Sequence, residues 1–306
     1  MTLVLLISLL ALGAFATPPP KGPFTSDFVT FLDSREERFA YVLQSYRDYG
    51  DNGSFGGKTE QGQKIKRDPV IFVHGNADGA LYFTNGSGMG WSAHIDYFKD
   101  RGYTSAELYG ATYGDRNVTT AVNNHVSCKN IGIFRNLIEA VLEYTQVDAF
   151  VGLAGPNYGL CVCLLAGLND KRSCSSIDGF FSGTCGKAGE PDALTSMCHT
   201  TITPCQEQGF SSVLKTLNDK GKDAGFVASL WSRDDDLIGK GNFVWGLKTS
   251  LIPRSDFEYE ATGLNHWEVK DKMIDYQFNL VTTHSRTGSS HHHHKSKRDG
   301  RRHRRH

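Results

Sequence analysis

Short apolar runs are the first pattern along this chain, and they predict buried strands. The runs are rich in β-branched and aromatic residues and are bounded by charged or glycine-rich segments, as strands in the middle of a parallel sheet are. Together they would form the core of one sheet. The predicted strands are Pro69–Val73, Ala106–Leu108, Val147–Leu153, Phe226–Trp231 and Phe257–Tyr259.

Between these runs, apolar residues recur at the spacing of amphipathic helices. Helices are predicted in the lead-in Phe28–Tyr46, around Trp91–Phe98, over Asn130–Tyr144 and from near His266 onward. Because strands alternate with helices, we expect the α/β class with a mainly parallel, doubly wound sheet. The cysteine-rich stretch Tyr158–Cys205 is predicted to be an insertion over that sheet.

The two ends of the chain differ in composition from its body. Residues 1–16 are almost wholly apolar, too short to span a bilayer comfortably and end in small residues, which predicts a secretory signal peptide cleaved after Ala16. Residues 285–306 hold eight basic side chains, one acidic and none that is apolar, so we expect a basic, His-rich, disordered tail. Residues 17–284 remain as one domain. Residues 1–284 carry 32 acidic and 25 basic side chains, and no nucleic-acid partner is expected.

Two further patterns fit a secreted protein. The sequons at Asn52, Asn85 and Asn117 lie in polar, Gly-rich surroundings and are candidate glycosylation sites. Most of the cysteines cluster, which in an oxidising compartment predicts disulfides and not a metal site. The odd number of cysteines implies that one thiol is free or has lost its partner. The disulfide candidates are Cys128, Cys161, Cys163, Cys174, Cys185, Cys198 and Cys205.

Candidate chemistry follows three of the predicted strands. His74-Gly75-Asn76 opens a small-residue loop after the first strand, Asp234–Asp236 follows a late strand, and His266 stands just before the closing helix. The carboxyl ends of parallel strands meet at one edge of the sheet, where such a loop can direct backbone N–H groups at an oxyanion. Taken alone, each feature has a plainer interpretation: a buried histidine at a turn, an acidic surface turn or weak calcium loop, and a histidine beside a helix cap.

The order of these motifs resembles that of the class 2 secreted lipases, which are α/β-hydrolases. The resemblance covers about Ser26–Leu280 and implies hydrolysis of acylglycerol esters without a cofactor. By position, Asn76 would donate an oxyanion N–H, Asp235 would be the acid and His266 the base, with Asp236 as the alternative acid. The motifs that carry it are HGNADG (74–79), LYGATYGD (108–115), AGPNYG (154–159), SRDDDLIG (232–239) and GLNH (263–266).

One part of the family pattern is absent from the sequence. No serine has glycine at both the −2 and the +2 position, so the Gly-x-Ser-x-Gly nucleophile elbow is missing. In the family this elbow follows the strand that comes after the predicted helix Asn130–Tyr144. The chain instead continues from Gln146 into a strand that comes one strand–helix unit later. We therefore hypothesise that a strand–helix unit with the serine is lacking between about Thr145 and Val147, as from a gene model or splice form without one exon.

Two classes of function remain open from the sequence. The first is a secreted triacylglycerol lipase or carboxylesterase acting on a lipid or ester substrate, and the second is a catalytically inactive pseudo-lipase that binds lipid or a protein partner. A third hypothesis, an improvised nucleophile, would use Ser87 or Ser182. Binding at a lipid interface is expected in either of the first two cases, without a transmembrane span.

Overall fold

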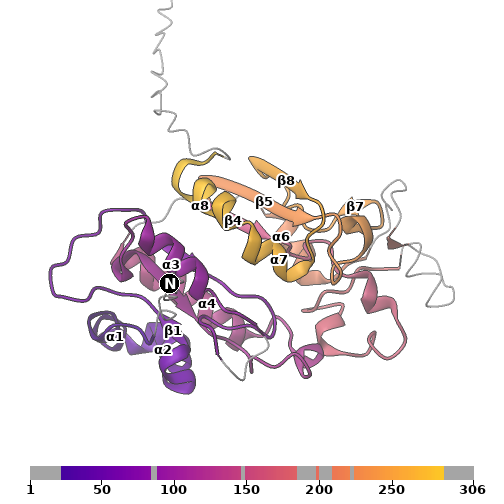
Figure 1. Ribbon diagram of the computed structural model, residues 1–306. Helices are drawn as coiled ribbons and strands as arrows, with labels where there is room; N and C mark the ends of the chain where they lie inside the picture. Colours follow the sequence, from indigo (N-terminus) through magenta and orange to yellow (C-terminus); the bar gives the residue numbers. More distant parts are fainter. Residues whose placement is uncertain are drawn as a thin grey trace, which may run out of the picture.

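The computed structural model describes residues 22–83, 88–145, 149–184, 198–199, 209–220 and 224–285 (Figure 1). The predicted signal peptide and nearly all of the predicted tail lie outside these residues. The described helices are α1 Ser26–Asp33, α2 Glu36–Tyr49, α3 Ser92–Asp100, α4 Cys128–Tyr144, α6 Ser212–Asp219, α7 His266–Lys272 and α8 Ile274–Thr283. The strands are β1 Ser54–Phe55, β2 Val70–Phe72, β3 Leu108–Ala111, β4 Ala149–Leu153, β5 Phe226–Ser232, β6 Phe243–Val244, β7 Leu247–Lys248 and β8 Phe257–Ala261.

The first three strands form one small sheet in the order β1–β3–β2. Strand β3 lies in the middle, parallel to β2 and antiparallel to β1. We call this sheet with α1 to α4 the N-terminal unit. Its helices α1, α2 and α4 pack around Phe28, Phe39 and Leu137, none of which is exposed. The expected strand and helix alternation is therefore present in this unit.

Strand β3 begins later in the chain than the predicted strand Ala106–Leu108. Ser105–Glu107 forms a 3₁₀ turn, because Thr104 and Glu107 hydrogen-bond to each other's backbone as a capping box. The strand then runs over Leu108–Ala111, three residues beyond the predicted end at Leu108. All of these strand residues are buried between β1 and β2. The predicted bounds of this strand, Ala106–Leu108, were thus wrong, and only Leu108 belongs to it.

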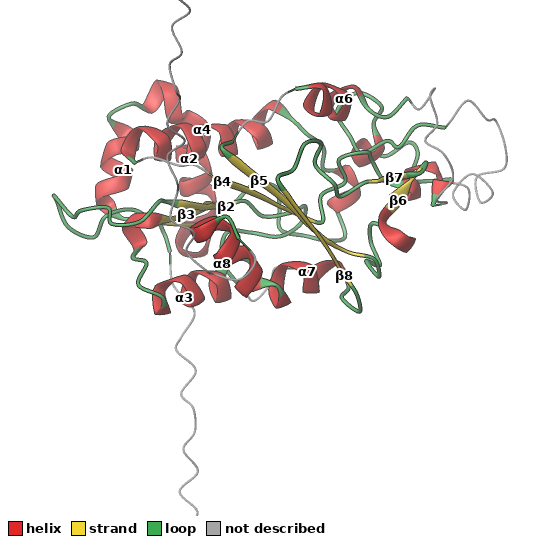
Figure 2. Cartoon of the chain, turned by 90° about the horizontal axis from the view of Figure 1, so that it is seen from above, coloured by secondary structure: helices red, strands yellow, loops and turns green. Residues whose placement is uncertain are grey.

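Strands β4, β5 and β8 form a second sheet, parallel throughout, in the order β4–β5–β8. We call this sheet with α6, α7 and α8 the C-terminal unit (Figure 2). The predicted closing helix is divided into α7 and α8, because Met273 leaves helical geometry between them. None of the described helices is long and apolar enough to cross a bilayer.

The continuous sheet expected from the sequence is not formed by the described residues. Strand β2 pairs only with β3, and β4 pairs only with β5, so among the described strands each of the two is an edge strand with one side unpaired. The two units still touch, because Leu153 of β4 packs against the cluster that contains Phe72 of β2. The α/β class with parallel strands is confirmed, but the sheet is interrupted between β2 and β4.

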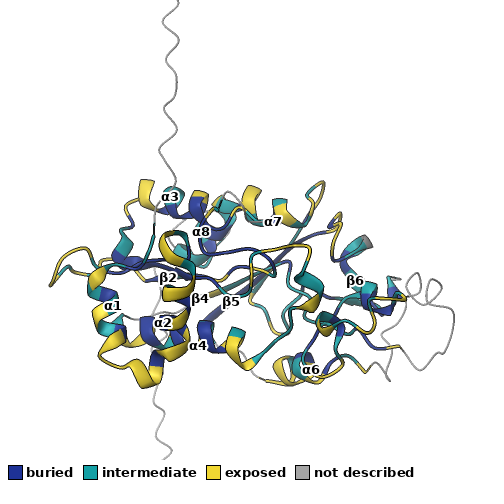
Figure 3. Cartoon of the chain, turned by 90° about the horizontal axis from the view of Figure 1, so that it is seen from below, coloured by how far each residue is buried: buried dark blue, intermediate teal, exposed yellow. Residues whose placement is uncertain are grey.

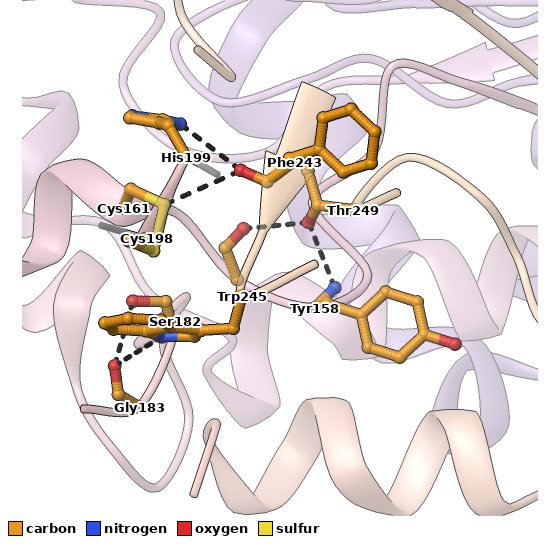
Figure 4. Close-up of a disulfide and its surroundings, with 10 residues drawn as sticks. Tyr158, Cys161, Ser182, Gly183, Cys198, His199, Phe243, Trp245 and Thr249 are labelled. Atoms are coloured by element: carbon orange, nitrogen blue, oxygen red, sulfur yellow. Dashed lines mark hydrogen bonds between the residues drawn. A yellow bond between two sulfur atoms is a disulfide. The ribbon is translucent and has the colours of Figure 1, made fainter. Parts of the chain in front are cut away.

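Two disulfides lie within the insertion, and the β6–β7 hairpin packs against it. Bonds link Cys161 to Cys198 and Cys163 to Cys174. Next to the first bond, the indole N–H of Trp245 donates to the Gly183 carbonyl at 2.9 Å (Figure 4). These contacts hold the hairpin against the cysteine-rich stretch.

The remaining disulfide candidates have different outcomes. Cys128 has a free, exposed thiol, because it stands at the first turn of α4 in the N-terminal unit and not in the insertion. Its prediction as a disulfide cysteine is therefore wrong in this structure. Cys185 and Cys205 lie outside the described residues.

Candidate active site

The structure brings Asp235 and His266 into direct contact. Asp235 lies in the turn after β5, and His266 is the first residue of α7, which follows β8. Because β5 and β8 are parallel neighbours, both residues stand at the same edge of the sheet. The Nδ1 atom of the imidazole lies 2.8 Å from Oδ2 of the carboxylate. Such a contact fixes the tautomer of the ring and leaves Nε2 as the atom that can move a proton.

The carboxylate of Asp235 is held rigidly. Its side chain is fully buried, and Oδ1 accepts backbone N–H groups from Leu237 at 2.9 Å and Ile238 at 2.7 Å. Oδ1 therefore accepts hydrogen bonds from the turn, and Oδ2 contacts the imidazole. A buried carboxylate with both oxygens engaged cannot turn away from His266 without losing hydrogen bonds.

The two neighbouring aspartates have other partners. Asp234 accepts the Gly263 N–H at 2.6 Å, and Asp236 accepts the backbone N–H of His266 at 3.0 Å. Asp236 thus stabilises the start of α7 without a hydrogen bond to the imidazole. The calcium-loop interpretation gains no support, because the described residues contain no group of three or more potential metal ligands.

The start of α7 explains why His266 has a fixed position. Asn265 caps the helix by accepting the Glu268 N–H, while the Glu268 carboxylate accepts the Asn265 N–H, both at 2.9 Å. This capping box sets the first helical residue at His266. The plainer interpretation of a histidine beside a helix cap therefore holds together with the contact to Asp235.

The loop after β2 presents free backbone donors. The Asn76 side chain is held by two hydrogen bonds: it donates to the Ala121 carbonyl at 2.9 Å and accepts from the Asn124 side chain at 2.7 Å. Ala77 has a φ of 65°, a conformation that costs energy for a residue with a side chain. No described residue accepts the backbone N–H of either Asn76 or Ala77. Two adjacent free N–H groups are the feature that an oxyanion hole requires.

His74 supports this loop and is not available for proton transfer. Its Nε2 accepts the Tyr113 N–H at 3.0 Å, so Nδ1 carries the hydrogen and donates to the Gly75 carbonyl at 2.7 Å. The ring also stacks on Tyr113. Burial lowers the pKa of His74 to about 4, which keeps the ring neutral. The interpretation of His74 as a packed histidine at a turn is the one that fits.

The other candidate residues lie apart from this site. Ser182 is fully buried beside Trp245 in the insertion (Figure 4), and Ser87 lies outside the described residues. Among the sequons, Asn117 is exposed and Asn52 partly buried, while Asn85 lies outside the described residues. Glycosylation remains a prediction.

One part of the site was missed in the sequence. Lys270, one turn after His266 on α7, donates to the buried Asp78 carboxylate at 2.6 Å. Asp78 follows Asn76 and Ala77, so this ion pair connects the loop after β2, residues 74–79, to the helix that carries the histidine. No sequence signal marks the pair, because its members are 192 residues apart.

Comparison with protein-family models places the chain in a known family. The family model described as lipase (class 2) matches residues 67–148 and 146–279. The two matched segments overlap at residues 146–148. Together they cover the loop after β2, residues 74–79, as well as Asp235 and His266. No curated protein matches the chain significantly.

Proposed function

The chain belongs to the class 2 lipase family, and we propose that it hydrolyses carboxylic esters of acylglycerols by a Ser–Asp–His mechanism. The serine would stand on a strand–helix unit that this form of the chain lacks. The observation that carries the proposal is the 2.8 Å contact between His266 and the buried Asp235 at the carboxyl edge of the sheet. Family membership supports a lipase-like hydrolase in general, and the details that follow are proposals.

The residues present supply most of the chemistry. The imidazole of His266 takes the proton from the serine hydroxyl as its oxygen attacks the ester carbonyl, and Asp235 stabilises the resulting imidazolium. The N–H groups at Asn76 and Ala77 stabilise the oxyanion of the tetrahedral intermediate. His266 then returns the proton to the departing alcohol, and water releases the fatty acid from the acyl-enzyme in a second round.

Three observations support a missing unit between Thr145 and Ala149. The family match falls into two segments that meet at residues 146–148. The sheet is interrupted between β2 and β4, and β4 is the strand that begins directly after this point in the chain. Apolar side chains that another strand and helix would cover are exposed instead. They are Val73 (42%), Ile131 (45%), Ile138 (40%), Leu142 (46%) and Phe150 (53%).

The experiment that tests the proposal reads the transcript across Tyr144–Ala149 and assays the encoded protein. We expect a longer transcript that adds an apolar strand, a Gly-x-Ser-x-Gly turn and a helix. Its product should hydrolyse a p-nitrophenyl ester on the order of 10³-fold or more faster than this chain, since removing a nucleophile costs rates of that order. A transcript that matches this chain without interruption contradicts the missing unit.

A pseudo-lipase is the second candidate function, and one observation favours it. The whole sequence contains no serine in the elbow pattern. In that case the chain would bind lipid or a protein partner without hydrolysis. A fluorophosphonate probe on the protein that the transcript encodes separates the two functions: labelling at an elbow serine favours the lipase, and no labelling favours the binder. Labelling at Ser87 or Ser182 identifies an improvised nucleophile.

Secretion is part of the same proposal. The apolar residues 1–16, the sequons and the disulfides Cys161–Cys198 and Cys163–Cys174 support an oxidising, extracellular location. Sequencing the amino terminus of the protein from culture medium tests it. A mature chain that begins at Thr17 is the expected result, and protein confined to the cell pellet would contradict it.

A further inference from the structure

We propose that the buried ion pair between Asp78 and Lys270 is a positioning device that holds the oxyanion loop in register with His266. The inference rests on the proposed ester hydrolysis for its purpose, and on geometry for its existence. Lys270 follows His266 by four residues on α7, so the two side chains lie on the same side of the helix. Asp78 directly follows the free N–H groups of the loop.

Asp78 is more tightly enclosed than an ordinary surface carboxylate. The residue is 2% exposed, and Oδ1 accepts the N–H groups of Gly79 and Gly90, each at 2.9 Å. A Cβ on Gly88 would lie 2.0 Å from the same oxygen, so the backbone there closes directly over the carboxylate. The second oxygen is the one that Lys270 contacts. Every oxygen of the Asp78 side chain is therefore satisfied inside the protein.

Lys270 is enclosed in the same way. Its side chain is 11% exposed, and Nζ donates to Asp78 at 2.6 Å and to the Gly90 carbonyl at 2.9 Å. The Lys270 carbonyl also accepts from His94 of α3 at 3.0 Å and from Gln277 of α8 at 2.7 Å. Both the side chain and the backbone of this residue thus connect α7 to its neighbours.

The charges match this arrangement. Burial alone would raise the pKa of Asp78, but the Lys270 ammonium and the two glycine N–H groups outweigh it and lower the pKa. The Asp78 carboxylate therefore remains ionised at neutral pH. A buried pair of this kind contributes little net stability compared with apolar residues, while loss of one partner is costly. Its presence is better explained by geometric specificity than by stability.

The position of the pair explains what it would do. The loop belongs to the N-terminal unit and His266 to the C-terminal unit, and no ladder of strand hydrogen bonds joins β2 to β4. To act on one carbonyl carbon, an oxyanion donor and a general base must hold their relative positions to within about half an ångström. The Asp78–Lys270 contact fixes the distance between the two units next to the N–H groups of the loop and the imidazole of His266.

The test compares K270M with K272M in the full chain by NMR. Lys272 lies on the same helix but pairs with Glu268 on the surface, which makes K272M a matched control. We expect K270M to lose the downfield Nδ1–H resonance that His266 shares with Asp235, identified by its absence in H266Q. The amides of Gly79 and Gly90 should exchange about ten-fold faster or more. K272M should change neither signal, and K270R should restore both in part.

A second variant covers the case in which K270M fails to fold. D78N/K270M leaves no unpaired buried charge, and the side-chain amide that replaces the Asp78 carboxylate can still accept the glycine N–H groups through its oxygen. We expect it to fold and to show the same loss of the His266 resonance. If this double variant unfolds at a lower temperature but keeps the resonance and the amide protection of the wild-type protein, the pair is only structural and the proposal is overturned. Neither readout requires turnover, so failure of ester hydrolysis would not be mistaken for failure of this inference.

Discussion

Strands β4 and β5 pair residue for residue, yet their burial is opposite. Every residue of β5 is buried, whereas no residue of β4 is (Figure 3). Phe150 in β4 is 53% exposed. Leu230 and Leu153 sit directly opposite each other in the ladder, but Leu230 is fully buried and Leu153 only partly. The sequences of both strands are apolar runs, so composition does not explain the difference.

The difference teaches that an apolar run predicts a central strand only if the chain supplies a neighbour on each side. Strand β5 has β4 and β8 as partners, and β4 has β5 alone. A run suited to two neighbours but given one exposes an edge that other chains can pair with. Strand β2 of the N-terminal unit also has a single partner, but Val70 and Phe72 are buried in the cluster that Leu153 of β4 contacts.

The largest expected effect concerns the chemistry that the C-terminal unit holds. In the serine-bearing form, D235N should lower kcat by about 10⁴-fold, because the amide no longer selects the active tautomer of His266. The neighbouring change D236N should lower kcat by less than about ten-fold, since Asp236 contacts only the backbone N–H of His266. Kinetics on a soluble ester measure both. Equal losses would show that the acid is shared between the two aspartates.

Acid should weaken the N-terminal unit before the C-terminal one. Burial lowers the pKa of His74 and of His94 to about 4, below the usual value of 6.5. The unfolded chain therefore binds protons that the folded chain does not, and stability falls as the pH drops from 6.5 to 4, by roughly 3 kcal/mol for each histidine. Urea unfolding at pH 7, 5.5 and 4.5 measures the loss.

The C-terminal unit provides the contrast to this acid response. Burial alone would raise the pKa of Glu260, but hydrogen bonds from Lys248, Trp231 and Arg233 lower it to about 2. The stability that this carboxylate contributes is present above pH 4.5 and is lost only as the pH falls toward 2. Hydrogen exchange, corrected for intrinsic rates, should show β3 opening at a higher pH than β5. Simultaneous opening would contradict the assignment.

Matched truncations of the facing leucines test the burial difference itself. L230A should cost about 3 kcal/mol, because it removes a fully enclosed side chain and leaves a cavity. L153A should cost about 1 kcal/mol, because water already reaches part of Leu153 and can fill the space. The free energy of unfolding in urea measures both. In the longer form with the missing unit, the two costs should become similar.

The smallest expected effect is at the edge of β4. F150T keeps a strand-forming residue and removes an exposed aromatic ring, so stability should change by less than about 0.5 kcal/mol. Aggregation at high protein concentration should fall, because the unpaired edge becomes less apolar. Light scattering measures this change. A loss of several kcal/mol would mean that Phe150 is covered in solution.

The sequence predicted the elements that depend on local pattern. The motif order placed Asp235 and His266 correctly relative to each other, since parallel strands bring their carboxyl ends together. The family resemblance named Asp235 as the acid with Asp236 as the alternative, and in the structure Asp235 contacts the imidazole while Asp236 contacts only the backbone N–H of His266. The strand at Leu108–Ala111 was misplaced because a capping box at Thr104 is not distinguishable from a strand start by hydrophobic pattern.

Long-range pairing was beyond the reach of sequence. Lys270 lies in an amphipathic helix among other charged residues, where a lysine is ordinarily solvated. Only the folded chain brings it to Asp78. The hydrophobic pattern likewise did not predict the interruption of the sheet, since the apolar runs of β2 and β4 each indicate a strand buried on both faces.

The separation of the two sheets has a consequence for how the polypeptide could be divided. Each sheet takes all its strands from one continuous stretch, 54–111 for the first and 149–261 for the second. Cleavage of the peptide backbone between Thr145 and Ala149 would therefore sever no strand from its partners. The resulting halves would be complementary fragments, each with its own hydrogen-bonded sheet, and their reassociation would require no strand pairing between the described strands.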